Sequence, residues 1–73
     1  MEEILKNSGF TLKKSEFING KFKKVWYKIS YGRSYEINVY PQTKEWKLLY
    51  SEKVIATGTE SNLIYKLIDY SLV

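Results

Sequence analysis

Lysines and large aromatic side chains alternate along one segment of the chain, residues 21–31, which reads KFKKVWYKISY. Lysine ammonium groups bind phosphate, and an exposed aromatic ring gives a flat surface on which a nucleobase stacks. Successive residues of a strand point to opposite faces of the sheet. One face would carry Val25, Tyr27, Ile29 and Tyr31. The other would carry Phe22, Lys24, Trp26, Lys28 and Ser30. We interpret the first set as core and the second as a display surface.

The side chains that most often carry catalysis are absent or scattered. The chain has no histidine and no cysteine, which removes the commonest general base and the usual zinc ligands. Its acidic residues are spread along the chain, mostly beside lysines, and its four glycines match no phosphate-binding spacing. We therefore expect a protein that is not an enzyme and that needs no cofactor and no metal.

The length of 73 residues allows one domain, residues 1–73. No apolar stretch approaches the roughly 20 residues that cross a bilayer, and the acidic start does not resemble a signal peptide. The absence of cysteine fits a reducing compartment. We expect a cytoplasmic protein without a membrane partner.

The net charge of +4 is concentrated in one part of the chain. Residues 13–33 hold seven basic residues against Glu16 alone, which leaves a charge of −2 on the remainder. Such asymmetry is typical of a basic patch that meets an anionic partner. Lysines on hairpin edges also keep small sheets from pairing with one another, and this alternative has equal weight.

Helix signals lie at the two ends and strand signals between them. Residues 2–8 fit a short helix with Ile4 and Leu5 inward, ended by Gly9. Near the other end, Thr59 is a candidate N-cap. It precedes an apolar stripe of Leu63, Ile64, Leu67 and Ile68, which Tyr70 and Leu72 extend. The pattern predicts an α+β fold: an antiparallel meander of four to five strands with both helices, the short N-terminal one and the C-terminal one, packed on one face.

Turn signals set the expected register of the sheet. The Asn19-Gly20 turn pairs Ile18 with Lys21 and, further along, Leu12 with Tyr27. A three-residue loop at 32–34 would pair Ile29 with Ile37. A four-residue loop at 41–44 would pair Val39 with Trp46, and residues 54–57 are a candidate fifth strand that places Ile55 beside Tyr50.

This register gathers one apolar face and leaves one face open. The apolar face consists of Phe10, Leu12, Val25, Tyr27, Ile29, Tyr35, Ile37, Val39, Trp46, Leu48 and Tyr50. The open face is centred on two neighbouring aromatic residues, Trp26 and Tyr40, with lysines around them. The candidate binding residues are Lys13, Lys24, Trp26, Lys28, Tyr40 and Lys47.

Three interpretations of that surface remain open. Its rings and lysines suit single-stranded nucleic acid, because stacking tolerates any base and lysines attract phosphates. The same side chains also suit simple cross-strand packing, with lysine stems lying over the rings. They also suit an interface with an acidic protein partner, or with a second copy of the chain in a homodimer, where aromatic residues are enriched although lysine is depleted. We expect a small non-enzymatic nucleic-acid-binding module. The alternative is a protein-interaction or inhibitor module of the phage or mobile-element accessory type.

The order helix, strands, helix resembles the double-stranded-RNA-binding fold. The opening Ile4-Leu5-Lys6-Asn7-Ser8-Gly9-Phe10 is similar to that of the HicA messenger-RNA interferases, which use this fold. That family needs a histidine on its strands, and this chain has none. The expected helix start, residues 59–62, also carries no lysine. The resemblance therefore implies neither interferase activity nor membership of the family.

Overall fold

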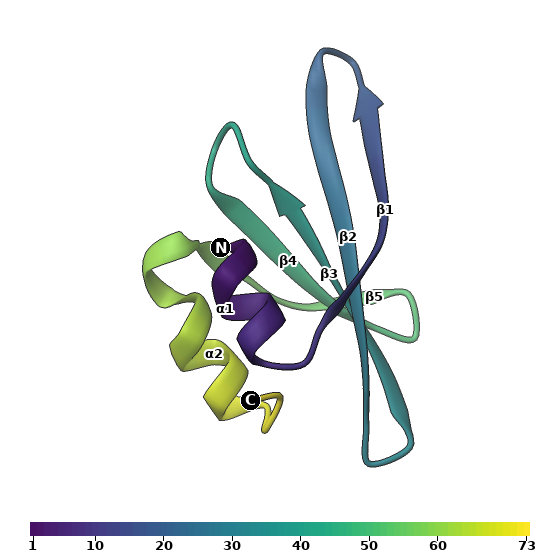
Figure 1. Cartoon of the computed structure of the whole chain (residues 1–73), viewed down its shortest axis with the longest axis vertical. Helices are drawn as coiled ribbons and strands as arrows, with labels where there is room; N and C mark the ends of the chain where they lie inside the picture. Colours follow the sequence, from purple (N-terminus) through teal and green to yellow (C-terminus); the bar gives the residue numbers. More distant parts are fainter.

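The computed structural model describes the whole chain, Met1–Val73, as a five-stranded antiparallel sheet with helices at both ends (Figure 1). The elements are α1 (Glu2–Asn7), β1 (Thr11–Ile18), β2 (Lys21–Ser30), β3 (Arg33–Tyr40), β4 (Glu45–Tyr50), β5 (Lys53–Thr59), the 3₁₀ turn η1 (Glu60–Asn62) and α2 (Leu63–Asp69). The strands lie in the sheet in chain order. The predicted α+β meander is confirmed, and so is its fifth strand. The predicted pairing of Ile55 with Tyr50 is wrong, because Tyr50 pairs with Lys53 and Ile55 falls at a bulge without a partner. No helix is long and apolar enough to cross a bilayer.

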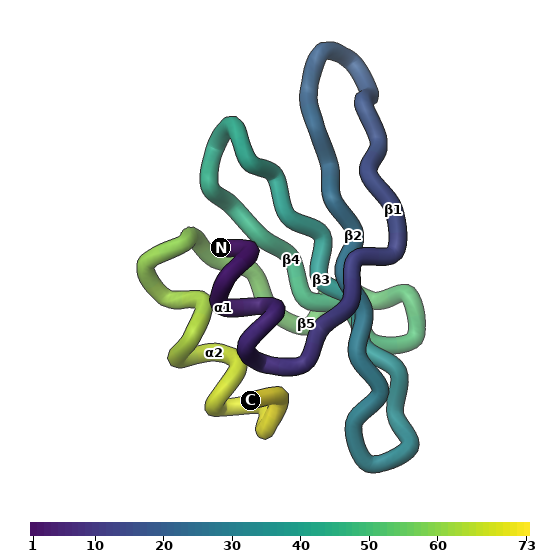
Figure 2. The backbone as a smooth tube through the Cα atoms, in the orientation of Figure 1, coloured from purple at the N-terminus to yellow at the C-terminus, as the bar shows by residue number.

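Both helices lie on the same side of the sheet, and both chain ends lie on that side too (Figure 2). The first helix ends as predicted at Gly9, whose φ of 86° places it in the left-handed region that glycine tolerates. The reversal lets the Phe10 N–H donate to the Leu5 carbonyl at 2.9 Å. It also turns Phe10 inward, where its side chain is buried.

The second helix ends in the same way without a glycine. Ser71 takes a φ of 57°, and the Leu72 N–H donates to the Leu67 carbonyl at 2.8 Å. The predicted extension of the helix through Tyr70 and Leu72 is wrong, because α2 ends at Asp69 and the chain then reverses. The reversal buries the Leu72 side chain completely.

The pairing of β3 with β4 agrees with the sequence prediction. Val39 pairs with Trp46 and Ile37 with Leu48, on either side of the loop at residues 41–44. These four side chains are among the least exposed in the molecule. The turn chemistry and the apolar alternation point to the same register here, so the register is well specified.

The pairing of β2 with β3 differs from the prediction. The turn consists of Tyr31 and Gly32, with φ values of 52° and 75°, and it pairs Ser30 with Arg33. Positive φ at both central residues is the geometry of the two-residue hairpin turn that suits the twist of a sheet. Trp26 therefore pairs with Ile37, and the register moves by three positions from the predicted one. An odd shift turns every side chain of β2 to the other face.

A bulge at Lys13 changes the first hairpin as well. The predicted pairs hold from Ile18–Lys21 to Lys14–Val25, and then Leu12 pairs with Trp26 because Lys13 has no partner. Leu12 thus lies on the helical side, where the prediction also placed it, although 43% of its surface is exposed.

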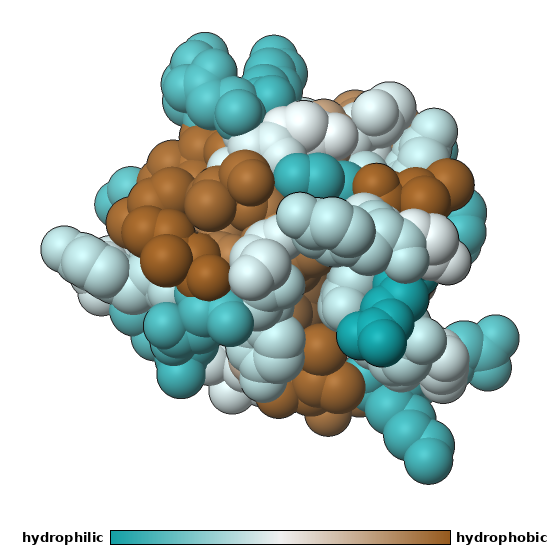
Figure 3. Space-filling model, turned by 90° about the horizontal axis from the view of Figure 1, so that it is seen from below, coloured by the Kyte–Doolittle hydropathy of each residue, from teal (hydrophilic) through white to brown (hydrophobic).

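The hydrophobic core lies between the sheet and the two helices. Its members are Leu5, Phe10, Trp26, Tyr35, Ile37, Val39, Trp46, Leu48, Leu63, Leu67 and Leu72. Only half of the predicted α2 stripe is buried, because Ile64 and Ile68 are 36% and 54% exposed. In the view from below, hydrophobic surface gathers on the side where Figure 1 draws α2 (Figure 3).

Tyr50 of β4, also expected in the core, is 38% exposed. Three more expected core residues, all from segment 21–31, are exposed because β2 faces the opposite way. Tyr27, Ile29 and Tyr31 are 37%, 68% and 93% exposed. Val25 is buried as predicted, yet it lies outside the core cluster, on the open face of the sheet. β2 therefore turns toward the helices the face that alternation had assigned to solvent, while the order of the strands is as predicted.

Candidate nucleic-acid interface

The six candidate binding residues are divided equally between the two faces of the sheet. The helical side holds Lys24, Trp26 and Lys28, which alternate along β2. The open face holds Lys13, Tyr40 and Lys47. Tyr40 and Lys47 alternate with the buried residues Val39, Trp46 and Leu48, and Lys13 binds Glu36 on the same face. The structure therefore does not bring the six together in one patch.

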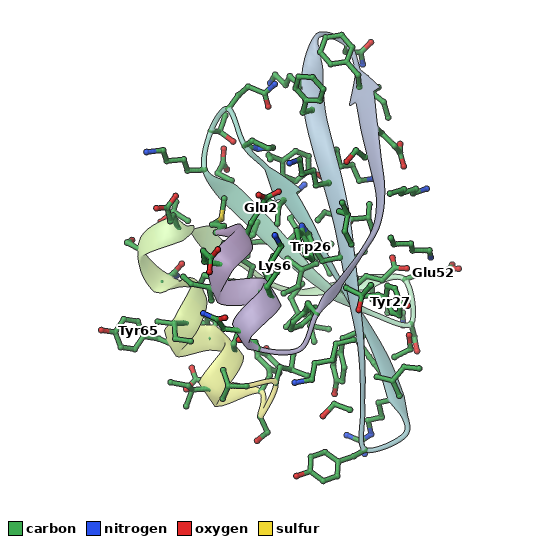
Figure 4. All side chains as sticks on the ribbon, in the orientation of Figure 1. Glu2, Lys6, Trp26, Tyr27, Glu52 and Tyr65 are labelled. Carbon is green, nitrogen blue, oxygen red and sulfur yellow. The ribbon has the colours of Figure 1, made fainter.

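Trp26 is a core residue. Its side chain is 2% exposed and lies between α1 and the sheet (Figure 4), so its predicted place on the open face is wrong. Its indole Nε1 has no hydrogen-bond partner. An unpaired buried donor costs about 1–3 kcal/mol, which the burial of the large ring outweighs. Trp26 offers no surface on which a base could stack.

Iodide is expected to quench neither tryptophan appreciably. Trp26 and Trp46 are 2% and 1% exposed, so the anion cannot reach either ring. Stern–Volmer measurements on Trp26→Phe and Trp46→Phe, each with a single tryptophan, should give equally shallow slopes. Trp26 is the only tryptophan of the Trp46→Phe variant, so a slope close to that of free tryptophan in this variant would contradict the burial of Trp26. The Trp26→Phe variant retains Trp46 and serves as the reference.

The two lysines on the helical side are engaged with the helices. Lys28 Nζ donates to the Ser8 carbonyl at 2.6 Å and to the Leu72 carbonyl at 2.8 Å. It also lies 5.8 Å from the centre of the Phe10 ring. Ser8 caps the end of α1 and Leu72 follows the reversal after α2, so one ammonium group connects the segments that end the two helices.

Lys24 binds a carboxylate at the start of the first helix. Its Nζ donates to Glu2 Oε1 at 2.7 Å. This hydrogen bond, with the positive charge of Lys24, lowers the pKa of the Glu2 carboxyl from its ordinary value. The pair joins α1 to β2, and it points the Lys24 side chain away from the open face.

On the open face, two of the lysines near the bulge are paired with acids. Lys13 Nζ lies 2.7 Å from Glu36 Oε2, and Lys14 Nζ lies 2.7 Å from Glu16 Oε1. The second contact lowers the pKa of the Glu16 carboxyl and raises that of the Lys14 ammonium, chiefly through their hydrogen bond. Exposed pairs of this kind are weak, so both lysines can exchange partners with an incoming anion.

Tyr40 is the centre of the open face at the end near the β3–β4 loop. Lys47 Nζ lies 5.7 Å from the centre of its ring. A hollow of about 360 Å³ lies beside it, lined by Lys21, Tyr40, Gln42, Thr43, Glu45, Trp46, Lys47, Thr57, Gly58 and Thr59. A second hollow of about 290 Å³ is lined by Ile18, Asn19, Lys21, Phe22, Lys23 and Tyr40. Tyr40 and Lys21 line both, so the hollows are neighbours.

Lys21 and Lys23 are residues of this site that the sequence reading missed. They alternate with the residues assigned to the display side of β2, so the reversed face assignment hid them. The signal that could have found them is the Asn19-Gly20 turn, because it fixes their position at the tip of the first hairpin. Neither lysine forms an ion pair in the structure.

The first hairpin is also where the net charge lies. Residues 13–24, which we call the arm, hold five lysines and one glutamate, a charge of +4. The other seven basic and seven acidic residues cancel. Residues 21–23 pair with β1 only, because the β2–β3 ladder begins at Lys24, so the end of the arm is a two-stranded ribbon. The arm projects above the rest of the molecule (Figure 1).

No group of three or more acidic side chains is placed to hold a metal ion. The arrangement instead combines an aromatic ring, a positive ribbon and two shallow hollows. No family model, no curated protein and no solved structure matches the chain.

Proposed function

We propose that the chain is a non-enzymatic module that binds single-stranded nucleic acid on the open face of its sheet. Tyr40 stacks on a base, while Lys21, Lys23 and Lys47 contact the phosphates on either side. The supporting observation is that Lys47 lies 5.7 Å from the centre of the Tyr40 ring and that Lys21 and Lys23 line a hollow of about 290 Å³ with it. None of the three lysines forms an ion pair within 4.0 Å. Lys13 and Lys14 add charge further along the arm.

Electrostatics favours this ligand over a neutral one. The arm holds the entire net charge of the chain, so an anionic polymer is attracted to it and not to the neutral remainder. The side chain of Tyr40 is half-buried, which restricts its orientation while part of its surface stays in contact with solvent. Stacking on such a ring contributes about 1–3 kcal/mol per base without sequence preference.

Titration of a fluorescent oligothymidylate tests the proposal. If about three phosphates are neutralised, affinity should fall roughly 20-fold between about 50 and about 200 mM salt. Tyr40→Ala should weaken binding about tenfold, because it removes the stacking surface. Tyr65→Ala is the matched control, since Tyr65 is exposed on α2 and points away from the sheet (Figure 4).

A charge-matched pair separates a specific site from general attraction. Lys21→Gln/Lys23→Gln should weaken binding more than Lys6→Gln/Lys53→Gln, although both remove two positive charges. Equal losses, or no binding to any oligonucleotide at low salt, would overturn the proposed function.

The exposed surface of α2 supports a second candidate function, self-association. Ile64, Tyr65 and Ile68 are 36%, 67% and 54% exposed on one short helix, and isoleucine and tyrosine suit protein interfaces better than nucleic acid. Light scattering would distinguish a dimer from the 8.7 kDa monomer. A mass that stays monomeric at high concentration excludes this alternative.

A further inference from the structure

Two phenylalanine rings are exposed at the end of the arm. Phe17 and Phe22 face each other across the hairpin, and 63% and 48% of their surfaces are accessible. Their centroids are 4.8 Å apart, with an angle of 61° between the ring planes. This edge-to-face contact fixes the rings relative to each other, yet leaves most of their apolar surface in water. The core lies too far down the arm to bury them.

On the basis of the function proposed above, we propose that the Phe17–Phe22 pair is a second base-stacking site for the strand that stacks on Tyr40. Phe22 and Tyr40 line the same hollow of about 290 Å³, together with Lys21 and Lys23. Phe22 alternates with Lys21 and Lys23 along β2, so the two phenylalanine rings lie on the opposite face of the ribbon. A strand that leaves Tyr40 along this hollow passes the two lysines and then crosses the edge of the ribbon to reach the rings.

The arm is held in the position that this path requires. The Phe22 N–H donates to Gln42 Oε1 at 3.3 Å, which connects the ribbon to the β3–β4 loop. The Asn19-Gly20 turn, with φ values of 53° and 75°, closes the ribbon tightly. Both stacking sites are therefore present before the ligand arrives, and little ordering is needed on binding.

Two separate stacking sites restrict the class of ligand. Bases in a duplex are stacked on one another and covered on both sides, so they cannot lie on Tyr40 and on the phenylalanine pair at once. A single strand can unstack its bases and follow the arm. The expected ligand is thus a flexible single strand that is long enough to reach both sites, and a shorter strand occupies Tyr40 alone.

Affinity measured against strand length tests the inference. Oligothymidylates of about four, eight and twelve nucleotides cover the range over which small sheet modules bind. For the wild type, affinity should rise at least tenfold between the shortest and the longest. Phe17→Leu/Phe22→Leu keeps the apolar surface but removes the rings. This variant should lose most of that gain and bind the shortest strand normally. Tyr31→Leu, at the 93% exposed turn of the opposite hairpin, is the control.

The outcomes separate this inference from the proposed function. If the leucine variant retains the full gain with length, or if a duplex of equal length binds the wild type as tightly, the second stacking site is overturned while binding at Tyr40 stands. If no strand binds the wild type, both proposals fail. Ultraviolet cross-linking of the wild-type protein to the longest strand gives a readout that does not depend on a folded variant. An adduct on Phe17 or Phe22 supports the inference, and adducts confined to other residues contradict it.

Discussion

Lys28→Met is expected to lower the free energy of unfolding by about 3 kcal/mol, because two hydrogen bonds from a charged donor are lost. The carbonyls of Ser8 and Leu72, 2.6 and 2.8 Å from Lys28 Nζ, would lose their shared cation. Domains of this size are stable by roughly 4–10 kcal/mol, so the loss is a large part of the total. The melting temperature should fall by about 10–20 °C. Methionine keeps the apolar stem over Phe10, so the effect reports the ammonium group.

Calorimetry and urea titration measure this loss. Lys23→Met is the matched control, since Lys23 is also partly buried on the same strand but faces the other way and forms no ion pair. It should change the free energy of unfolding by less than about 0.5 kcal/mol. Hydrogen exchange should also become faster at the amides of Phe10 and Leu72, which close the two helix ends. Equal stabilities of the two methionine variants would show that Lys28 does not join the helices.

Gly58→Ala is expected to destabilise the fold by about 2–5 kcal/mol through overpacking and loss of a helix cap. A Cβ at Gly58 would lie 2.7 Å from Trp46 Cζ2 and closer still to the side-chain oxygen of Asn62. Trp46 is 1% exposed and has no room to move. The Asn62 oxygen accepts from the Thr59 N–H at 2.9 Å, so its displacement opens the start of η1.

Two further variants separate the components of this effect. Asn62→Ala removes the cap without a clash and should cost about 1 kcal/mol. Thr57→Ala, at the neighbouring exposed position, should be nearly neutral. Urea unfolding followed by tryptophan fluorescence measures the stability of all three variants. Trp46 is a suitable probe, because its Nε1 donates to the Thr59 carbonyl at 2.8 Å, next to the substituted positions. A Gly58→Ala protein as stable as the wild type would mean that Trp46 and Asn62 repack freely.

The candidate site was only partly predictable from the sequence. Tyr40 and Lys47 lie together on the open face as predicted, because the Pro41–Lys44 loop and the apolar alternation of β3 and β4 specify one register. Lys24 and Lys28 were expected to meet a ligand, and each instead binds a partner near a helix end. Those partners lie about 20 residues or more away along the chain, so no local sequence pattern predicts these contacts.

The face of β2 is the clearest case of a choice that local patterns leave open. Both of its faces carry large apolar side chains, so alternation alone does not identify the buried one. Which face is buried depends on the turn between β2 and β3. In that turn Tyr31 has a left-handed conformation that a residue with a Cβ rarely adopts. That strain is tolerated because the resulting register buries Trp26 beneath α1.

By itself the sequence determined the element order, the α+β meander, the end of α1 before Gly9, and a charge gathered near the first hairpin. It also identified Thr59 as a cap, although Thr59 caps η1 and α2 begins only at Leu63. These follow from local chemistry: turn residues, caps and apolar periodicity act over a few neighbouring positions. Tertiary structure decided which side of β2 is buried and which lysines remain free. Register is a property of packed strands, and a shift of three positions moved Trp26 from the expected binding surface into the core. It also left Lys21 and Lys23 beside Tyr40.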